Sequence, residues 1–250
     1  MTERFRGRIV LVNAAAGVGI GSSVVRRFMQ EGAAVAVSDR NPKRLRALED
    51  ELVSAHGAER VLAIAGDAGD EQAVTALVDA VAERYGRLDV LVNSVGLNIL
   101  AEWPHTPLDT WRTVLDTSLT SHYLHARAAW PLLQRSDAAA IVNISSLAAQ
   151  NPAPFGEVAY AAAKGGVLGL TAALAAEGAR DRIRVNAVMP GLIWNERLTA
   201  GVADEYVDAY RSKRLFDADG TPDEVADLIA FLASTDARNI TGQAIKVGAQ

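Results

Sequence analysis

The 250-residue sequence contains no cysteine, and this absence excludes several chemistries. Disulfide bonds, thiolate catalysis and cysteine-ligated metals all require that side chain. The four histidines are therefore the only soft metal ligands in the chain. His122 and His125 share one face of a predicted helix, but we interpret them as ordinary packed or surface residues and predict no metal site.

The sequence also has little excess basic charge and no long apolar run. Its formal net charge is -5, and no lysine or arginine cluster stands apart from acidic neighbours, so we expect no binding to nucleic acid. The opening MTERFRGRIVLV has too short an apolar run for a signal peptide, and no run of about 18 apolar residues could span a membrane. We expect a soluble, cytoplasmic protein with no membrane partner.

What the sequence does contain is a regular alternation of short β-rich runs and longer segments of helical period. Amphipathic helices are expected at Ser22–Gln30, Pro42–Ala55, Glu71–Tyr85 and Pro107–Leu133. Strands are expected at Ile9–Asn13, Ala34–Ser38, Val61–Ala65, Val90–Asn93, Ala140–Ser145, Arg184–Val188 and Ala244–Val247. The pattern predicts an α/β fold: a Rossmann-like, doubly wound, seven-stranded parallel sheet with helices on both faces.

Chain length and hydrophobic content indicate a single domain. Half of the 250 residues are hydrophobic, so residues 1–250 can bury one substantial core and are predicted to form one dinucleotide-binding and catalytic domain. The longest excursion between a strand and a helix is Gly191–Gly220, which is rich in charge and aromatic side chains. We predict that residues 191–220 form a substrate lid.

The stretch VNAAAGVGIG, residues 12–21, follows the first predicted strand. A helix that begins near Ile20 would direct backbone N–H groups toward a bound pyrophosphate. Asp39 ends the second strand about 20 residues later, where a carboxylate can accept hydrogen bonds from both hydroxyls of an adenosine ribose. Its charge repels a 2′-phosphate, so we expect NAD rather than NADP, although the neighbouring Arg40 could hold that phosphate. The other interpretation of Asp39 is a plain strand-end cap.

A second motif, YAAAKGG, places Tyr160 and Lys164 four residues apart on one helix face. A nearby cation favours phenolate, so we expect Lys164 to lower the pKa of Tyr160 toward neutrality. The run IVNISS places Ser145 and Ser146 at the carboxyl end of the fifth strand, where open α/β sheets bind ligands. A serine there can hold a substrate oxygen while the tyrosine transfers its proton, or it can merely finish the strand.

With these motifs in this order, the sequence resembles the short-chain dehydrogenase/reductase family of the single-domain type over nearly the whole chain. The matching stretches are GIG at 19–21, EGA at 31–33, GD at 66–67, LDVLVN at 88–93, NISS at 143–146, YAAAK at 160–164, RVNAVMPG at 184–191 and TGQ at 241–243. The resemblance implies that Tyr160 is the catalytic acid or base, that Lys164 lowers its pKa and holds the nicotinamide ribose, and that Ser146 polarises the substrate oxygen. It also implies cofactor contacts for Ala15, Gly17, Gly19, Ile20, Asp39, Arg40, Asp67, Ala68, Asn93, Gly96, Tyr160, Lys164, Pro190, Gly191 and Ile193.

The sequence departs from the family pattern at four places. Ala14-Ala15 replaces the usual Thr-Gly, with one extra residue in the glycine turn, and the usual NNAG reads NSVG at 93–96. Ser118 stands where the family commonly has an asparagine that holds a water near the lysine, so we take it as a candidate catalytic residue of the proton relay. Ser146 precedes Tyr160 by fourteen residues rather than the more usual thirteen, and the chain ends KVGAQ. We expect a longer substrate loop and a modified C-terminal surface.

Three functions are open at this point. The first is an NAD(H)-dependent oxidoreductase that interconverts a secondary alcohol and a ketone on an apolar, alicyclic or terpenoid- or steroid-fragment-like substrate. The second is a 3-oxoacyl-thioester reductase, and the third a non-catalytic dinucleotide sensor. The apolar side chains expected around the substrate are Leu97, Ile99, Leu100, Trp103, Phe155, Leu192 and Trp194. The cations that could meet a carrier phosphate are Arg197, Arg211, Lys213 and Arg214. The family resemblance also implies a homo-oligomer, a tetramer.

Overall fold

The computed structural model of the chain describes residues 3–194, 203–216 and 218–248. Its centre is a seven-stranded sheet in the order β3-β2-β1-β4-β5-β6-β7, in which every neighbouring pair runs parallel. The strands are β1 (Ile9–Val12), β2 (Ala34–Asp39), β3 (Val61–Ala65), β4 (Val90–Asn93), β5 (Ala140–Ile144), β6 (Arg184–Pro190) and β7 (Ala244–Val247). The predicted fold class is confirmed, and each predicted strand end lies within two residues of the observed one.

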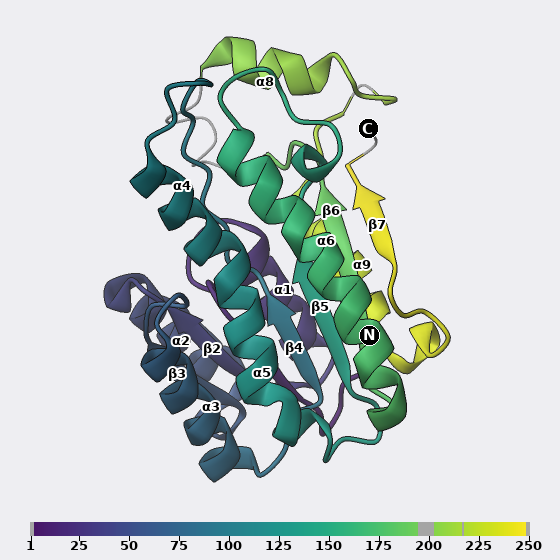
Figure 1. Ribbon diagram of the computed structural model, residues 1–250. Helices are drawn as coiled ribbons and strands as arrows, with labels where there is room; N and C mark the ends of the chain where they lie inside the picture. Colours follow the sequence, from purple (N-terminus) through teal and green to yellow (C-terminus); the bar gives the residue numbers. More distant parts are fainter. Residues whose placement is uncertain (1–2, 195–202, 217, 249–250) are drawn as a thin grey trace.

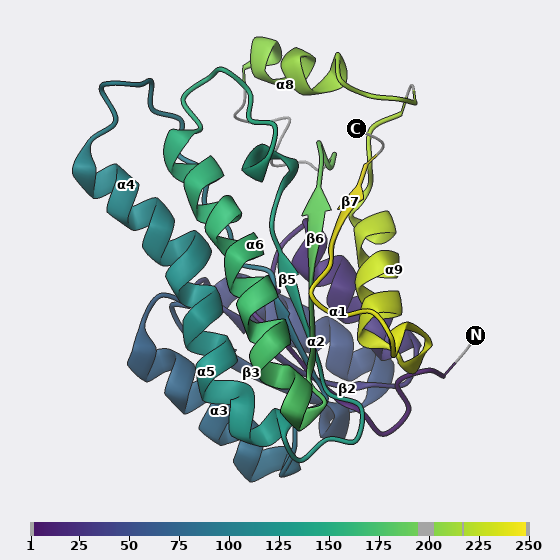
Figure 2. The same ribbon diagram turned by 45° about the vertical axis from the view of Figure 1, so that its right-hand side comes forward.

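Helices cover both faces of this sheet (Figures 1 and 2). One hydrophobic core lies under α1 (Ile20–Gln30), α2 (Pro42–His56) and α9 (Pro222–Ala233). The other lies under α3 (Glu71–Tyr85), α5 (Ser121–Leu133) and α6 (Val158–Gly178). The central strands β1, β4 and β5 are buried on both sides, as expected for parallel strands between two helical layers.

Helices α2 and α9 begin at capping side chains. The Asn41 side chain accepts a hydrogen bond from the Arg44 N–H, and Pro42 occupies the first turn of α2. Thr221 and Glu224 form a reciprocal capping box at the start of α9. Short 3-10 turns occur at η1 (Ala58–Arg60), η3 (Leu147–Ala149), η4 (Ala179–Asp181) and η5 (Thr235–Ala237).

The helix predicted over Pro107–Leu133 is observed from Leu108 to Leu133, with one irregularity that helical periodicity does not predict. It consists of α4 (Leu108–Leu115), a π-helical segment (Asp116–Thr120) and then α5. The Ser118 hydroxyl in the π-helical segment exchanges two hydrogen bonds with the Leu97 backbone: it accepts from the amide at 2.9 Å and donates to the carbonyl at 3.2 Å. A contact between residues this far apart does not show in helical periodicity, so the sequence pattern missed it.

Helix α6 is unusually apolar. In the described part of the chain it is the one helix, Val158–Asp181, long and apolar enough by length and composition to cross a membrane. It packs along β5 and β6, and Ala163, Val167 and Ala175 are buried against the rest of the molecule. These contacts are those of a core helix.

The carboxyl ends of all the strands meet at one edge of the sheet, because every pair is parallel. Helix α8 (Asp204–Arg211) lies beyond that edge, over the amino-terminal end of α6 (Figures 1 and 2). The loops that follow β1, β2, β4, β5 and β6 therefore open toward the same region, where a parallel α/β sheet binds its ligands.

Candidate active site

The turn after β1 combines close packing with open space. A Cβ on Gly21 would lie 2.4 Å from the Ala14 carbonyl oxygen, so only glycine allows the first turn of α1 to approach this backbone so closely. Ala14 itself adopts a left-handed φ of 49° and Gly17 a φ of 146°. A Cβ on Gly17 or Gly19 would meet nothing within 4 Å, and no side chain caps α1 at Gly19. The α1 N-terminus therefore offers free N–H groups beside empty space.

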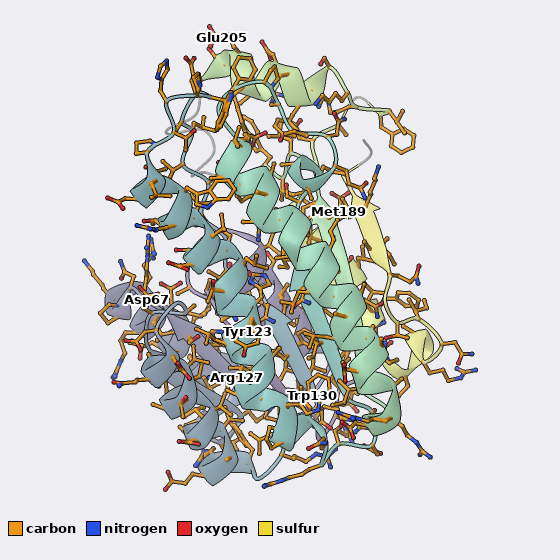
Figure 3. The ribbon with its side chains drawn as sticks, in the orientation of Figure 1. Asp67, Tyr123, Arg127, Trp130, Met189 and Glu205 are labelled. Atoms are coloured by element: carbon orange, nitrogen blue, oxygen red, sulfur yellow. The ribbon has the colours of Figure 1, made fainter. Side chains whose placement is uncertain are left out.

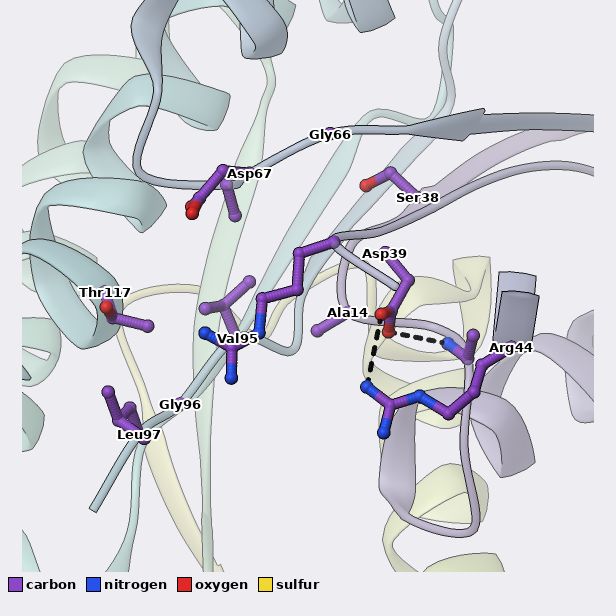
Figure 4. A pocket seen from close by; sticks show the side chains of 13 residues that line it. Ala14, Ser38, Asp39, Arg44, Gly66, Asp67, Val95, Gly96, Leu97 and Thr117 are labelled. Carbon is purple, nitrogen blue, oxygen red and sulfur yellow. Dashed lines mark hydrogen bonds and ion pairs between the residues drawn. The ribbon is translucent and has the colours of Figure 1, made fainter. Parts of the chain in front are cut away.

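A cavity of about 160 Å³ continues from this turn across the strand ends (Figure 4). The Asp39 carboxylate lies at its wall and is 6% exposed. It accepts hydrogen bonds from the Ala16 amide at 3.2 Å and the Asn41 amide at 2.8 Å, and the Arg44 guanidinium lies 3.5 Å away. The lining residues are Ala14, Ala16, Ser38, Asp39, Arg40, Arg44, Gly66, Asp67, Ala68, Val95, Gly96, Leu97 and Thr117.

These residues fit a dinucleotide. The uncapped N-terminus of α1 and the bare backbone of Gly17 and Gly19 suit a pyrophosphate, which attracts N–H groups. At the wall of the cavity, Asp39 supplies acceptor oxygens for ribose hydroxyls. Ala15 is fully buried, whereas Ala14 and Ala16 line the cavity. Ala14 and Ala16, rather than Ala15, are therefore the residues of this turn that can contact a cofactor.

The structure brings Ser146, Tyr160 and Lys164 together beside this cavity. The Lys164 ammonium donates to the Val95 carbonyl at 3.1 Å and the Ile144 carbonyl at 2.7 Å, and it lies 5.9 Å from the centre of the Tyr160 ring. A Cβ on Gly96 would come within 3.2 Å of that nitrogen, so glycine keeps the space in front of the lysine open.

The two serines at the end of β5 have different environments. The buried Ser145 hydroxyl donates to the Lys164 carbonyl at 2.8 Å and so holds α6 against the strand. Ser146 hydrogen-bonds toward the Tyr160 phenol and also accepts from the Ala148 amide at 3.2 Å. Ser146 is therefore the serine that faces the phenol.

Burial controls the proton affinities here. It raises the pKa of Tyr160 to about 12, with the Ser146 hydrogen bond lowering the pKa and the Glu157 charge raising it. Burial also lowers the pKa of Lys164 to about 7. This direction is opposite to the one expected from Lys164, because desolvation of the phenolate is the largest influence on the Tyr160 pKa.

A buried chain of amides was missed by the sequence analysis. The Asn13 side chain donates to Asn93 at 2.8 Å, Asn93 donates to Asn143 at 2.9 Å, and Asn143 donates to the Thr171 hydroxyl of α6 at 2.9 Å. The Asn13 side-chain oxygen also accepts from the amides of Ser94 and Val95. A signal was present in the sequence, because a Val-Asn pair stands at the end of each of the neighbouring strands β1, β4 and β5. The valines of the three pairs, Val12, Val92 and Val142, lie side by side in the sheet. The Asn93 side chain is thus committed inside the sheet, which leaves only its backbone for a cofactor.

The other predicted cofactor contacts lie at the strand ends. Asp67 is exposed and accepts from the Gly69 amide at 2.8 Å. Pro190 ends β6, and the Gly191 amide donates to the Val247 carbonyl at 2.9 Å. Ile193 forms an isolated parallel bridge with Gly220, which holds the two ends of the predicted lid together. Ile20 is the first residue of α1, and Ala68 and Arg40 line the cavity.

The predicted apolar substrate residues do not form one cluster. Leu192 and Phe155 pack with α8, and Leu97 lines the cofactor cavity. Ile99 and Leu100 are exposed, and Trp194 is exposed with the Arg211 guanidinium over its ring. Trp103 is 73% exposed and lines a separate cavity of about 340 Å³ beside the loop 152–158.

The predicted lid cations are engaged within the protein. Arg211 and Arg214 both pair with Asp219 at 2.7 Å. Lys213 donates to the Asn151 side chain at 3.2 Å. Arg197 lies outside the described residues.

The two helix histidines are buried. The pKa of His122 is lowered by burial and by the nearby Lys164, and burial lowers the pKa of His125 to about 4, so both imidazoles are neutral. The residues that the structure describes contain no group of three or more potential metal ligands.

Comparison with known proteins assigns this site to a family. A family model described as enoyl-(acyl carrier protein) reductase matches residues 14–249. A Mycobacterium tuberculosis protein, (5R,7aS)-5-hydroxy-7a-methyl-1-oxo-2,3,5,6,7,7a-hexahydro-1H-indene-carboxyl-CoA reductase, is 40% identical over 98% of this chain and 93% of its own length. The chain belongs to the short-chain dehydrogenase/reductase family.

Other members of the short-chain dehydrogenase/reductase family are similar to this chain over nearly its full length. The meso-2,3-butanediol dehydrogenase of Serratia marcescens is 32% identical over 98% of this chain and 94% of its own length. The crystal structure of a short chain dehydrogenase from Mycobacterium smegmatis is 37% identical, with a TM-score of 0.86 over 99% of this chain and 94% of that chain. The protein is accordingly an oxidoreductase of alcohols and ketones that acts on CH–OH groups with NAD or NADP.

Proposed function

We propose that the protein interconverts a secondary alcohol and a ketone on an apolar alicyclic ring system of the steroid-fragment type, with NAD as cofactor. The observation that carries the proposal is the gathering of Ser146, Tyr160 and Lys164 beside a cavity that fits a dinucleotide. The ring-system part is supported by the hydrindane-type substrate named for the M. tuberculosis relative.

Each residue of the proposed site has a separate role in binding or proton transfer. Nicotinamide, when bound, supplies or accepts the hydride. Tyr160 donates a proton to the substrate oxygen during reduction and accepts it during oxidation, while Ser146 holds that oxygen by a hydrogen bond. Lys164, anchored by two strand-end carbonyls, is placed to hold the ribose and to favour phenolate when it is charged. The α1 N-terminus and Asp39 would hold the pyrophosphate and the adenosine ribose.

Asp39 supports NAD over NADP. Its carboxylate is buried, so a 2′-phosphate placed against it would bring two negative charges together with little screening. Arg40 and Arg44 line the same cavity and are the groups through which NADP would bind instead. On family resemblance we further propose a cytoplasmic homotetramer.

A second candidate is a ketone carried on a coenzyme A or carrier-protein thioester. The named substrate of the M. tuberculosis relative, a CoA thioester, favours it. The described lid cations are held by Asp219 and Asn151, so we propose that recognition depends on the ring rather than on a carrier phosphate.

A substrate panel tests the proposal. Purified protein is assayed for absorbance change at the nicotinamide band with hydrindanones and decalones, their CoA thioesters, and linear 3-oxoacyl-CoA esters, each with NAD and with NADP. We expect turnover of the bicyclic ketones, with at least tenfold higher kcat/KM for NAD(H). Turnover of only the linear thioesters would support the second candidate. Tight NAD binding without turnover of any compound would indicate a dinucleotide sensor.

A further inference from the structure

Glu157 is a buried carboxylate directly before the catalytic helix. It is 2% exposed and precedes Tyr160 by three residues. Its two oxygens accept four hydrogen bonds: from Asn98 at 3.1 Å, the Tyr206 hydroxyl at 2.6 Å, the Ala153 amide at 2.7 Å and the Tyr210 hydroxyl at 2.8 Å. A carboxylate removed from water needs such donors, and hydrogen bonds to an ionised acceptor are the strong ones.

The donors come from three separate segments around the catalytic edge of the sheet. Asn98 lies in the loop after β4, Ala153 in the loop after β5, and both tyrosines on α8. The three segments that surround the proposed substrate site thus meet at one carboxylate. Ala153 is only four residues from Glu157, but Asn98 is 59 residues away and the two tyrosines are about 50 residues away, so only the folded chain joins these two segments to Glu157.

A small hydrophobic core surrounds the same point. Val207 and Tyr210 of α8 pack with Leu192 and Ala153, and Tyr206 and Phe155 lie against them. The rings of Tyr206 and Tyr210 are 5.2 Å apart between centroids. In the described part of the chain this cluster is separate from the two cores of the sheet, so the buried side chains of α8 are held by it and by the Glu157 hydrogen bonds.

The protonation states of the two tyrosines keep their hydrogen bonds to Glu157 intact. Burial and the Glu157 charge raise the pKa of both Tyr206 and Tyr210, so both phenols remain hydrogen-bond donors over the working pH range. Lys213 lies 5.4 Å from the centre of the Tyr210 ring and is the cation next to this group of side chains.

We propose that Glu157 is a positioning residue: it ties α8 to the loop that carries Asn98 and to the start of α6, the helix that carries Tyr160, and so sets the wall of the substrate site. The activity part of this inference rests on the proposed function. Within the described residues, the buried side chains of α8 pack in this small cluster and not in the two sheet cores, so loosening Glu157 should free α8 and widen the site. None of the four donors to Glu157 lines the cofactor cavity, so that cavity should change little.

The carboxylate also acts on the phenol by its charge. Tyr160 is faced by Ser146 from the end of β5, by Tyr210 from α8, and by Glu157 and Lys164 from its own helix. The negative charge of Glu157 opposes phenolate formation on Tyr160. Its removal should therefore be visible in the pH profile of turnover, which a purely structural contact would not move.

Hydrogen exchange of α8 tests the contact without requiring catalysis. Full-length protein saturated with NAD is compared with the Tyr206→Phe/Tyr210→Phe variant, which keeps the rings and removes both hydroxyl donors. We expect amide exchange in residues 204–211 to accelerate at least about tenfold. Glu205→Gln is the matched control, because Glu205 is exposed on the outer side of the same helix (Figure 3). Unchanged exchange in the double variant would overturn the inference.

Steady-state kinetics test the consequence for substrate. The double tyrosine variant should raise the substrate KM at least about fivefold with NAD affinity unchanged, and Glu157→Gln should move the pH profile of kcat to lower pH by about 0.5 to 1. A loosened α8 with unchanged KM would refute the positioning role. If the wild-type protein turns over no alcohol or ketone, the proposed function fails, and the exchange experiment alone decides whether Glu157 holds α8.

Discussion

At the scale of single residues, the site depends on ionisable groups that are partly or fully withdrawn from water. Lys164 is 1% exposed and bonded to two strand-end carbonyls, while Tyr160 is held in its neutral form by burial. Desolvation penalises the charged form of such a group, so a charged partner that approaches changes its proton affinity strongly. The chemistry is therefore sensitive to changes of a single atom.

Replacing Tyr160 by phenylalanine removes that atom. We expect Tyr160→Phe to lower kcat at least about 100-fold, because general acid–base transfer is lost while the ring still packs. NAD affinity, measured by fluorescence titration, should stay within about twofold. Tyr123→Phe is the control, since Tyr123 is 46% exposed on the outer face of α5 (Figure 3). Near-normal turnover by Tyr160→Phe would remove this residue from the mechanism.

Cofactor choice is also a single-residue matter. We expect the unmodified protein to prefer NAD by roughly 30- to 1000-fold in kcat/KM, equivalent to about 2–4 kcal/mol of repulsion and lost hydrogen bonds. Asp39→Ala should collapse this ratio to below about tenfold, because Arg40 and Arg44 then face a phosphate without the competing carboxylate. The measurement is kcat/KM with both cofactors. Equal or better use of NADP by the unmodified protein would contradict our interpretation of Asp39.

At the scale of elements, the π-helical segment between α4 and α5 depends on one hydroxyl. Ser118 is fully buried and exchanges two hydrogen bonds with Leu97, in the segment that also carries Val95 and Gly96 of the cofactor cavity. The residue therefore links a helix to the loop beside Lys164.

We expect Ser118→Ala to lower the free energy of unfolding by about 1 kcal/mol, because it removes two part-buried hydrogen bonds to the amide and carbonyl of Leu97. Turnover should fall, since the loop that receives the Lys164 hydrogen bond is loosened, while NAD affinity changes little. Denaturant titration and steady-state kinetics check the two effects. An unchanged stability and rate would show that the π-helical segment is held by other contacts.

Some features of these elements can be predicted from the sequence, and others cannot. Strands were placed to within two residues because buried parallel strands are continuous apolar runs bounded by turns. Ser146, Tyr160 and Lys164 could be predicted to meet because a strand end and a helix face are local patterns. The π-helical segment and the Glu157 contacts could not, because each depends on partners 21 to 59 residues away that only the folded chain brings together.

At the scale of the whole molecule, the amino-terminal ends of the strands, opposite the site, are stabilised by a buried carboxylate and its partners. Asp89 is fully buried and accepts from Ser136 at 2.6 Å and from the Ile9 amide at 2.8 Å, and it pairs with Arg8 at 3.1 Å and with Arg87. Burial alone would raise the pKa of Asp89, but these hydrogen bonds outweigh it and lower the pKa below its ordinary 3.8.

This arrangement predicts a pH dependence of stability. A carboxyl with a lowered folded-state pKa stabilises the protein above the unfolded pKa of 3.8, and that contribution disappears as the pH falls through the folded value. We expect Asp89→Asn to lower the melting temperature at pH 7 by several degrees and to flatten its fall between about pH 5 and pH 2. Asp109→Asn, at a 97% exposed side chain, is the control. An equally steep acid transition in Asp89→Asn would refute the assignment.

The asparagine chain has a direction as well as a length. Each amide donates toward α6, from Asn13 through Asn93 and Asn143 to Thr171, whose hydroxyl donates on to the Val167 carbonyl. No member can rotate its amide without presenting donor to donor at one junction and acceptor to acceptor at the other. Residues 13, 93, 143 and 171 are spread over more than half of the chain, and each is the hydrogen-bond partner of the next. We therefore expect the loss of any one amide to leave a buried partner unsatisfied between the sheet and the helix of Tyr160.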